Sequence, residues 1–252
     1  MHLVDHPDGG YAYVPGISPY SAGVVAAAGH RIRHVNLRRA TSWQDGFELI
    51  DETLAADGRP SRSLCSIELR CPEPYSFGGF GSFNDDYRTA LDSRGILLAD
   101  GVNPVARTNV APLIRPPART LLHAFAFTVP EPNGSRPSFV VSGAGDLRDQ
   151  ADLRAEAIVG GTSSWADSGT ERATAVLDEI QARLSGLGLG WADTDSVSVY
   201  SVESIHPVLE PTVLARLGDA SRRGVHWYLA APPVAGLRFE MDARGGVEEV
   251  WV

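Results

Sequence analysis

The chain has 252 residues and a formal net charge of −9, and all 22 of its basic residues are arginines. Without lysine the protein cannot form a Schiff base with a substrate, hold pyridoxal phosphate through a lysine, or bind phosphate through a Walker-type lysine. Any fixed cation in an active site must therefore be an arginine, a protonated histidine or a metal ion.

The hydropathy pattern and the charge balance favour a soluble protein of the cytoplasm. The longest apolar stretch covers residues 22–28, far fewer than the roughly 20 residues that span a bilayer. Residues 1–10 have neither the basic nor the apolar region of a signal peptide. The acidic surplus disfavours nucleic acid, because binding to a phosphate backbone depends on clustered basic residues. We therefore expect no membrane partner and no nucleic-acid partner.

The hydrophobic periodicity predicts the outline β–β–α–β–α–β–β twice, and six of the seven elements in each half can be assigned a residue range. In the first half the expected elements are a strand at 20–25, a helix at 43–56, a strand at 64–71, a helix at 82–93, and strands at 106–113 and 121–129. In the second half they are a strand at 139–145, a helix at 170–185, a strand at 196–200, a helix at 208–222, and strands at 225–230 and 236–242.

The two halves repeat in register from the first helix to the strand that follows it. Gly58 lies just beyond Leu54 at the end of one helix, as Gly188 lies beyond Leu184 in the other, and both glycines suit a left-handed helix C-cap. A proline-rich stretch between the halves is typical of a linker. We expect an N-terminal unit at 1–130, a linker at 131–137 and a C-terminal unit at 138–252.

The two cysteines belong to the predicted strand at 64–71. Strand alternation places Cys65 and Cys71 on one face with Ile67 and Leu69. We expect two buried, reduced thiols rather than a disulfide, a metal site or a nucleophile.

Other motifs of metal and cofactor sites are weak or missing. The run Gly78-Gly79-Phe80-Gly81 lacks a phosphate-binding lysine and leads into a helix whose N-cap we expect at Ser82. His30 and His34 lie near a strand end, where we expect a solvated hairpin rather than metal ligands. Zinc-ligand spacing and a Gly-x-Ser-x-Gly elbow do not occur. We therefore expect no metal and no cofactor.

Arg107 stands out because it lies on a short predicted strand between apolar residues. A buried guanidinium is costly unless an anion meets it, and it binds a carboxylate with two hydrogen bonds. The residues alone leave two interpretations open, which are an internal salt bridge and a site for a carboxylate ligand.

The surroundings of Arg107 resemble the RidA (YjgF) family of enamine and imine deaminases. In that family a Phe-Asn-x-x-Tyr helix precedes a Pro-Ala-Arg-Ser strand, and a closing strand carries a glutamate near the arginine. The corresponding stretches here are Phe83-Asn84-Asp-Asp-Tyr87, Val105-Ala106-Arg107-Thr108 and the strand at 121–126. In the second half, Ser142-Gly143 and the strand at 237–242 resemble parts of the same unit.

The whole chain is similar to two-unit proteins known as 2-aminomuconate and 2-amino-5-chloromuconate deaminases. The matching stretches are Tyr20-Ser-Ala-Gly23, Glu68-Leu-Arg70, Asn103-Pro-Val-Ala-Arg-Thr-Asn109, His123-Ala-Phe125, Thr128-Val-Pro130, Phe139-Val-Val-Ser-Gly143 and Phe239-Glu-Met-Asp-Ala-Arg-Gly245. The resemblance implies an α+β fold of two tandem RidA (YjgF)/chorismate-mutase-like units, each a mixed β-sheet packed against two helices. It further implies a homotrimer.

The same resemblance implies a cofactor-free deaminase that hydrolyses an enamine or imine carboxylate, similar to 2-aminomuconate, to a 2-oxo acid and ammonia. Two alternatives stay open. One is a RidA-fold enzyme of secondary metabolism that acts as a chorismate-type lyase, hydrolase or cyclase. The other is a non-catalytic module that binds a small ligand.

The resemblance also suggests the site residues, although neither half carries the family's arginine and glutamate together. The first half has Arg107 but His123 at the glutamate position, whereas the second has Glu240 but His226 at or near the arginine position. The catalytic candidates are therefore Arg107, Glu240 and His123. Either Arg107 and His123 form a modified site in one half, or Arg107 and Glu240 meet across a domain or subunit boundary.

The candidates for substrate binding are Asn84, Asn109, Tyr20, Phe83 and His226. The two asparagines suit the orientation of a carboxylate or of water, although each also suits a turn cap. Tyr20 and Phe83 are expected to form apolar walls.

Overall fold

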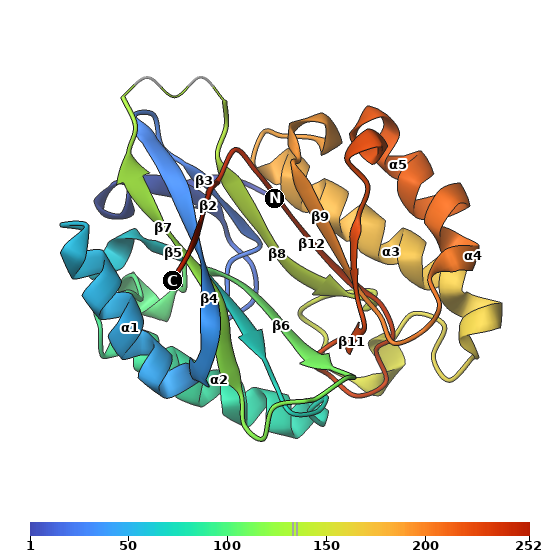
Figure 1. Ribbon diagram of the computed structural model, residues 1–252. Helices are drawn as coiled ribbons and strands as arrows, with labels where there is room; N and C mark the ends of the chain where they lie inside the picture. The colour runs from blue at the N-terminus through green and yellow to red at the C-terminus, as the bar shows by residue number, and fades with distance from the viewer. Residues whose placement is uncertain (133, 135) are drawn as a thin grey trace.

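The computed structural model describes residues 1–132, 134 and 136–252, and it contains two mixed β-sheets that face each other with helices outside (Figure 1). The helices are α1 (Trp43–Ala56), α2 (Phe77–Asp92), α3 (Trp165–Gly186), α4 (His206–Val208) and α5 (Ala215–Leu217). The strands of the first part are β1 (Val4–His6), β2 (Tyr11–Val14), β3 (Gly23–Ala26), β4 (His30–Ser42), β5 (Leu64–Arg70), β6 (Ala106–Pro112) and β7 (Leu121–Pro130). Those of the second part are β8 (Phe139–Gly145), β9 (Ser196–Tyr200), β10 (His226–Tyr228), β11 (Ala230–Ala231), β12 (Glu240–Gly245) and β13 (Glu248–Trp251).

The strand orders confirm the α+β fold and the internal repeat. One sheet runs β1-β2-β3-β8-β12-β9-β10 and the other β11-β6-β5-β7-β4-β13. The segment β4-β7-β5-β6 has the same pattern of antiparallel, antiparallel and parallel pairs as β8-β12-β9-β10. The repeat predicted from the sequence places the strand at 20–25 in the position that β8 holds in the second half. That correspondence is wrong, because β4 holds the equivalent position in the first half, and β3 pairs with β8 itself.

Strands cross between the halves of the chain. β3 extends the sheet of the second half through the pair Gly23 and Val141, and β13 runs parallel to β4 at the far edge of the other sheet. The short strand β11 pairs with the end of β6. Each sheet is therefore completed by strands from the other half. The linker expected at 131–137 includes residues 133 and 135, which lie outside the described residues.

Most of the predicted helices are present where they were expected, but some of their first and last residues differ from the prediction. α1 matches its predicted range, and Gly58 and Gly188 adopt the positive φ angles of 64° and 76° that a C-cap requires. α2 begins earlier than predicted, because the Ser76 hydroxyl accepts the N–H of Gly79 at 3.1 Å and the glycine-rich run forms the first turns.

The helix expected at 208–222 begins at His206 and changes type along its length. α4 is followed without a gap by a π-helical segment, Leu209–Leu214, then by α5 and a 3₁₀ turn, Gly218–Arg223. Pro211 explains the π-helical segment, because proline has no N–H to donate and its ring clashes with the preceding turn.

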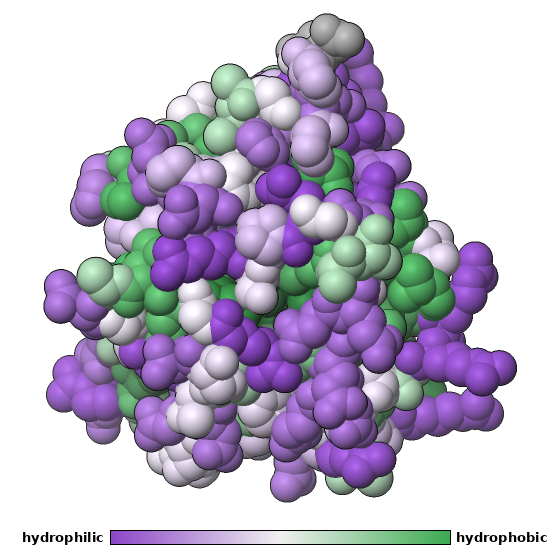
Figure 2. Space-filling view, turned by 90° about the vertical axis from the view of Figure 1, so that its left-hand side faces the viewer, coloured by the Kyte–Doolittle hydropathy of each residue, from purple (hydrophilic) through white to green (hydrophobic). Residues whose placement is uncertain are grey.

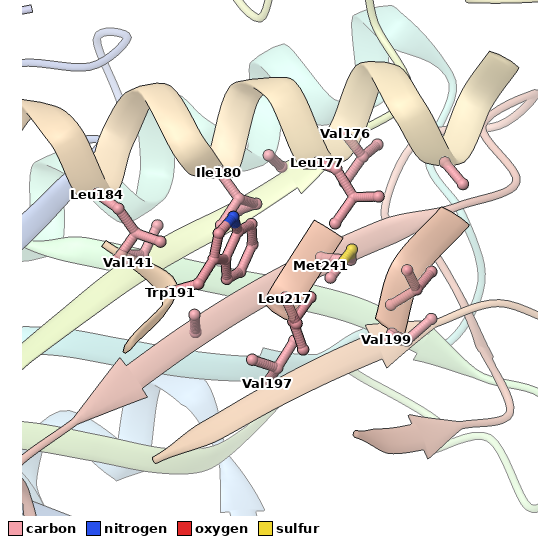
Figure 3. Packing of buried hydrophobic residues seen from close by; sticks show 14 of the residues in the cluster. Val141, Val176, Leu177, Ile180, Leu184, Trp191, Val197, Val199, Leu217 and Met241 are labelled. Atoms are coloured by element: carbon pink, nitrogen blue, oxygen red, sulfur yellow. The ribbon is translucent and has the colours of Figure 1, made fainter. Parts of the chain in front are cut away.

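Three apolar layers hold the elements together. The first lies between α3 and its sheet, where Val176, Leu177, Ile180 and Leu184 contact Met241 and neighbouring residues (Figure 3). The second lies under α1 and α2, and the third between the two sheets. On the outside, the face toward α1 is mainly hydrophilic with scattered hydrophobic residues (Figure 2). No helix in the described part of the chain combines the length and the apolarity that crossing a membrane requires.

Both cysteines are buried and free, as expected. The predicted shared face was wrong for Cys65, which packs between the sheets while Ile67 and Leu69 face the helices. The pairing of β5 with β7 shifts register between Leu64 and Ser66, which interrupts the alternation of side chains. Burial raises the pKa of the Cys71 thiol to about 12.

The solvated hairpin expected around His34 was also wrong. His34 lies on the long strand β4 and is 1% exposed. Its Nδ1 lies 2.8 Å from Oε2 of Glu249, on β13, and its Nε2 lies 2.9 Å from Oε1 of Glu68. Burial opposes the charge, but hydrogen bonds to these two carboxylates raise the pKa of His34 to about 9. His34 therefore ties the C-terminal strand to the first half as an imidazolium.

This ion cluster makes stability depend on pH. The unfolded pKa of histidine is about 6.5, so the contribution of His34 is complete below about pH 6.5 and is lost as the pH rises through about 9. We expect the free energy of unfolding of the wild type to fall over this window, relative to His34→Gln, by on the order of 2–3 kcal/mol. Urea denaturation at several pH values measures this difference. Parallel pH curves for the two proteins would contradict the assignment.

Candidate active site

The candidate site is a pocket at the junction of the two halves. There the strand β6 of one sheet lies beside β8 and β12 of the other. The Ser142 hydroxyl on β8 accepts the backbone N–H of Arg107 at 3.1 Å and donates to the carbonyl of Ser21 at 2.6 Å. The residues that line the pocket are Tyr20, Phe80, Arg107, Asn109, Gly143, Gly145, Leu147, Gln150, Leu153, Pro233, Val234, Leu237 and Glu240.

Arg107 is the cation of this pocket, and it is 2% exposed. Its Nη2 donates to Oδ1 of Asn84 at 2.7 Å, whereas its Nη1 has no hydrogen-bond partner in the described part of the chain. The internal salt bridge left open by the sequence is not formed, since no described carboxylate pairs with Arg107. The guanidinium carbon instead lies 4.7–5.7 Å from the ring centres of four aromatic residues, Tyr20, Tyr87, Phe80 and Phe83.

Burial lowers the pKa of Arg107, and the ordinary value is so high that the side chain stays charged at neutral pH. The aromatic rings support this charge with their negative faces but offer no hydrogen-bond acceptor to Nη1. An anionic ligand is the group that would complete the shell of the guanidinium.

Glu240, at the start of β12, provides an acid in the same pocket. Its pKa is raised well above the ordinary value, first by burial and then by the negative Asp242, while Arg183 and Arg107 act in the opposite direction. Burial and Asp242 both favour the neutral form of its carboxyl. It lies directly against Gly143, where a Cβ atom would come 2.2 Å from Oε1 of Glu240. The Ser142-Gly143 pair thus joins the strands and leaves room for the acid.

Asn109 is the second polar side chain that β6 directs into the pocket. It follows Arg107 by two residues and so shares its face of the strand. It is 3% exposed, and neither Oδ1 nor Nδ2 has a hydrogen-bond partner among the residues described.

The structure brings four of the predicted residues together in this pocket, namely Tyr20, Arg107, Asn109 and Glu240. Asn84 and Phe83 lie behind Arg107, which they contact from α2. Of the two arrangements considered for the catalytic pair, the structure therefore has the one in which Arg107 meets Glu240.

The two predicted histidines lie elsewhere. His123 and His226 line a different cavity, between the sheets, together with Asn36, Tyr228 and Arg244. Burial and the nearby Arg70 lower the pKa of His123 to about 4, so its ring is neutral. Nδ1 of His226 lies 3.2 Å from the Ser196 hydroxyl. Neither ring lies beside Arg107, because β7 and β10 direct these side chains toward the space between the sheets.

The sequence reasoning missed the groups that hold the pocket wall. Arg172 and Asp146 form a fully buried ion pair with an Nη1–Oδ2 distance of 2.5 Å. Oδ1 of Asp146 also accepts the backbone N–H groups of Arg238 at 3.0 Å and Phe239 at 3.4 Å. The pair therefore joins the segment after β8 to the segment before Glu240. The sequence could have indicated this pair, because Arg172 lies one helical turn before Val176 and so occupies a core-facing position of the predicted helix.

Comparison with known proteins gives a consistent result over nearly the full chain. Residues 3–250 match the model of the family described as 2-aminomuconate deaminase CnbZ. The chain belongs to this family. A 2-amino-5-chloromuconate deaminase of Comamonas testosteroni is 40% identical over 242 residues, which cover 96% of this chain and 95% of the relative.

Solved structures show weaker likeness to this member of the 2-aminomuconate deaminase family. A chorismatase crystal structure aligns with a TM-score of 0.47 and 12% identity, covering 97% of this chain and 85% of that one. A structure of a putative endoribonuclease of Thermotoga maritima aligns with a TM-score of 0.29 and 19% identity, covering 43% of this chain and 78% of that one.

The buried pair that supports the pocket can be tested by its effect on stability. Replacing Arg172 with Met leaves Asp146 buried without its cation, so we expect a loss of about 3–5 kcal/mol in the free energy of unfolding. Arg216→Met is the matched control, because it breaks the exposed Arg216–Asp178 pair and should cost less than about 1 kcal/mol. Urea denaturation measures both changes. Equal losses would show that the buried pair does not hold this region.

Proposed function

We propose that the protein is a deaminase that hydrolyses an enamine or imine carboxylate, similar to 2-aminomuconate, to a 2-oxo acid and ammonia. The observation that carries the proposal is the meeting of Arg107 and Glu240 in one pocket. Arg107 is a buried cation without an anionic partner among the described residues, and Glu240 is a buried acid. The family assignment supports the same reaction.

Arg107 would bind the carboxylate that lies next to the amino-bearing carbon. Its Nη1 donates to a carboxylate oxygen, while Asn84 holds Nη2 in place. The surrounding rings of Tyr20, Tyr87, Phe80 and Phe83 keep water from the guanidinium, which strengthens its interaction with the carboxylate.

Glu240 would move the protons. In its neutral form the carboxyl protonates the carbon chain of the enamine, which gives the iminium ion and leaves Glu240 as a carboxylate. That carboxylate then takes a proton from the water that adds to the iminium carbon, which gives a neutral carbinolamine and restores the acid. Transfer of the hydroxyl proton of the carbinolamine to its nitrogen and breakage of the carbon–nitrogen bond release ammonia, so that substrate and one water become the 2-oxo acid and ammonia.

Substrate binding also requires movement of the pocket wall. The pocket has a volume of about 30 Å³, which suits one or two water molecules rather than a six-carbon diacid. The segments 147–153 and 233–237 form much of the wall. We expect these segments to move apart when the substrate binds.

We further propose the two units 1–130 and 138–252, a cytoplasmic location and a homotrimer. The buried, free thiols suit a reducing compartment. Exposed apolar side chains at the ends of β6, β10 and β13, Leu113, Ile114, Tyr228 and Trp251, are available for subunit contacts. Light scattering on the purified protein measures the number of chains.

Replacing Arg107 with Met should separate function from folding. Methionine fills a similar volume among the aromatic rings and removes a buried charge that lacks an anionic partner, so stability should be unchanged or higher. Ammonia release from 2-aminomuconate should fall by at least about 100-fold, because the carboxylate loses a charge-assisted hydrogen-bond donor.

Arg94→Met is the matched control for Arg107→Met. Arg94 also lies over an aromatic ring, 4.6 Å from the centre of Phe47, but it is paired with Asp51 and lies outside the pocket. This variant should keep its activity. An Arg107→Met protein that unfolds while its folded fraction remains active would show that Arg107 has a structural role.

Replacing Glu240 with Gln preserves size and hydrogen bonding but removes the transferable proton. We expect kcat to fall by about 100-fold or more, with little change in thermal unfolding. The raised pKa of Glu240 favours its acid form, so wild-type kcat/KM should fall as the pH rises through the pKa of this carboxyl. The residual activity of Glu240→Gln should lack this alkaline limb. An unchanged pH profile would exclude Glu240 as the acid.

A further inference from the structure

The hydrogen-bonding groups of the pocket restrict which ligand fits it. Among the lining residues, Arg107 and Asn109 have buried polar atoms without a hydrogen-bond partner in the described part of the chain. In Arg107 the atom is Nη1, and in Asn109 both Oδ1 and Nδ2 are unpartnered. The other side chains with such atoms, which do not line the pocket, are His6, Ser21, Tyr87 and Trp191.

Asn109 differs from Arg107 in what it requires of a ligand. A guanidinium only donates hydrogen bonds, so a carboxylate provides the acceptor that Nη1 of Arg107 lacks. An amide carries an acceptor oxygen as well as two N–H donors, so a carboxylate alone satisfies only half of it. Since both ends of the Asn109 amide lack partners, exchanging its oxygen and nitrogen leaves the conclusion unchanged. The side chain also caps no turn, which was the other role considered for it.

The positions of the two residues suit a 2-amino acid. Arg107 and Asn109 lie two residues apart on the same face of β6, and both line the pocket. A 2-amino acid has its carboxylate and its nitrogen on adjacent carbons. One such ligand can therefore place its carboxylate against Arg107 and its nitrogen against Asn109.

We propose that Asn109 is a specificity-determining residue that recognises the amino nitrogen of the substrate. Its Oδ1 accepts an N–H of the amino group, while its Nδ2 donates to the neighbouring carboxylate that Arg107 holds. The inference rests on the proposed function, whose site it shares. A 2-oxo product presents only lone pairs to Oδ1, so Asn109 distinguishes substrate from product and favours product release.

The test compares two ligands that differ in the amino group. One is 2-aminomuconate, followed by ammonia release, and the other is muconate, the same diacid without the amino group, measured as a competitive inhibitor. Asn109→Leu has a similar shape and removes both polar ends, so the fold should be as stable as the wild type or more stable. We expect KM for 2-aminomuconate to rise by about 10-fold or more, while the inhibition constant of muconate rises much less, because muconate loses only the hydrogen bond from Nδ2 to its carboxylate.

Asn109→Asp provides the complementary variant, because it keeps an acceptor and loses the donor. Both ligands should bind it more weakly, since its charge repels their carboxylates. The preference for 2-aminomuconate over muconate should nevertheless persist. Equal weakening of both ligands by Asn109→Leu would show that Asn109 holds only the carboxylate, and no effect on either would remove it from the site. Both results overturn the proposal.

Failure of the proposed function gives a different result. A wild-type protein that releases no ammonia from 2-aminomuconate refutes the deaminase proposal alone. Calorimetry with 2-aminoadipate and adipate then tests Asn109 without turnover. Preferential binding of 2-aminoadipate that Asn109→Leu abolishes supports the amino-group assignment. Equal binding of the two diacids, or binding of neither by the wild type, overturns it.

Discussion

The arrangement of the active-site groups depends on one hydroxyl, that of Ser142. β6 pairs with β5 along one side, whereas on its other side the described residues pair with it only at its two ends, through a bridge between Ser21 and Ala106 and through β11. The buried N–H of Arg107 therefore needs another acceptor, and Ser142 Oγ provides it. The same hydroxyl donates to Ser21, and Gly143 beside it leaves room for Glu240. One polar contact thus brings together an arginine from one half and a glutamate from the other.

Exchange of strands keeps these groups in register. β3 extends the sheet of the second half, and β13 extends that of the first, where His34 binds the carboxylates of Glu68 and Glu249. Because strands cross in both directions, the halves cannot separate without breaking β-sheet hydrogen bonds. The strand residues of a site between them are then held as firmly as those of a site within one sheet, and proximity of the reacting groups requires such rigidity.

Polar groups in this interior divide into satisfied and unsatisfied sets. Asp146 is paired with Arg172, and Asp242 accepts hydrogen bonds from Thr108 and Tyr200 at 2.9 Å each. Around the pocket, by contrast, Arg107 and Asn109 bury atoms that nothing among the described residues satisfies. Such burial is unfavourable for folding, and ligand binding recovers that free energy. The satisfied groups support the walls, and the unsatisfied atoms that line the pocket are available to the substrate.

The sequence alone predicted the features that depend on neighbouring residues. These features are the helix α1, from its apolar spacing, the helix ends at Gly58 and Gly188, and the buried arginine on an apolar strand. Resemblance to a known family added Glu240. Only the tertiary structure decided which elements meet. The sequence predicted a hairpin at His34 because its partners Glu68 and Glu249 are distant in the chain. It predicted His123 in the place of the family's glutamate because hydrophobic periodicity does not show which strands of the two halves lie together. Periodicity records which face of an element is buried, whereas a site between halves depends on strand order, which non-local hydrogen bonds set.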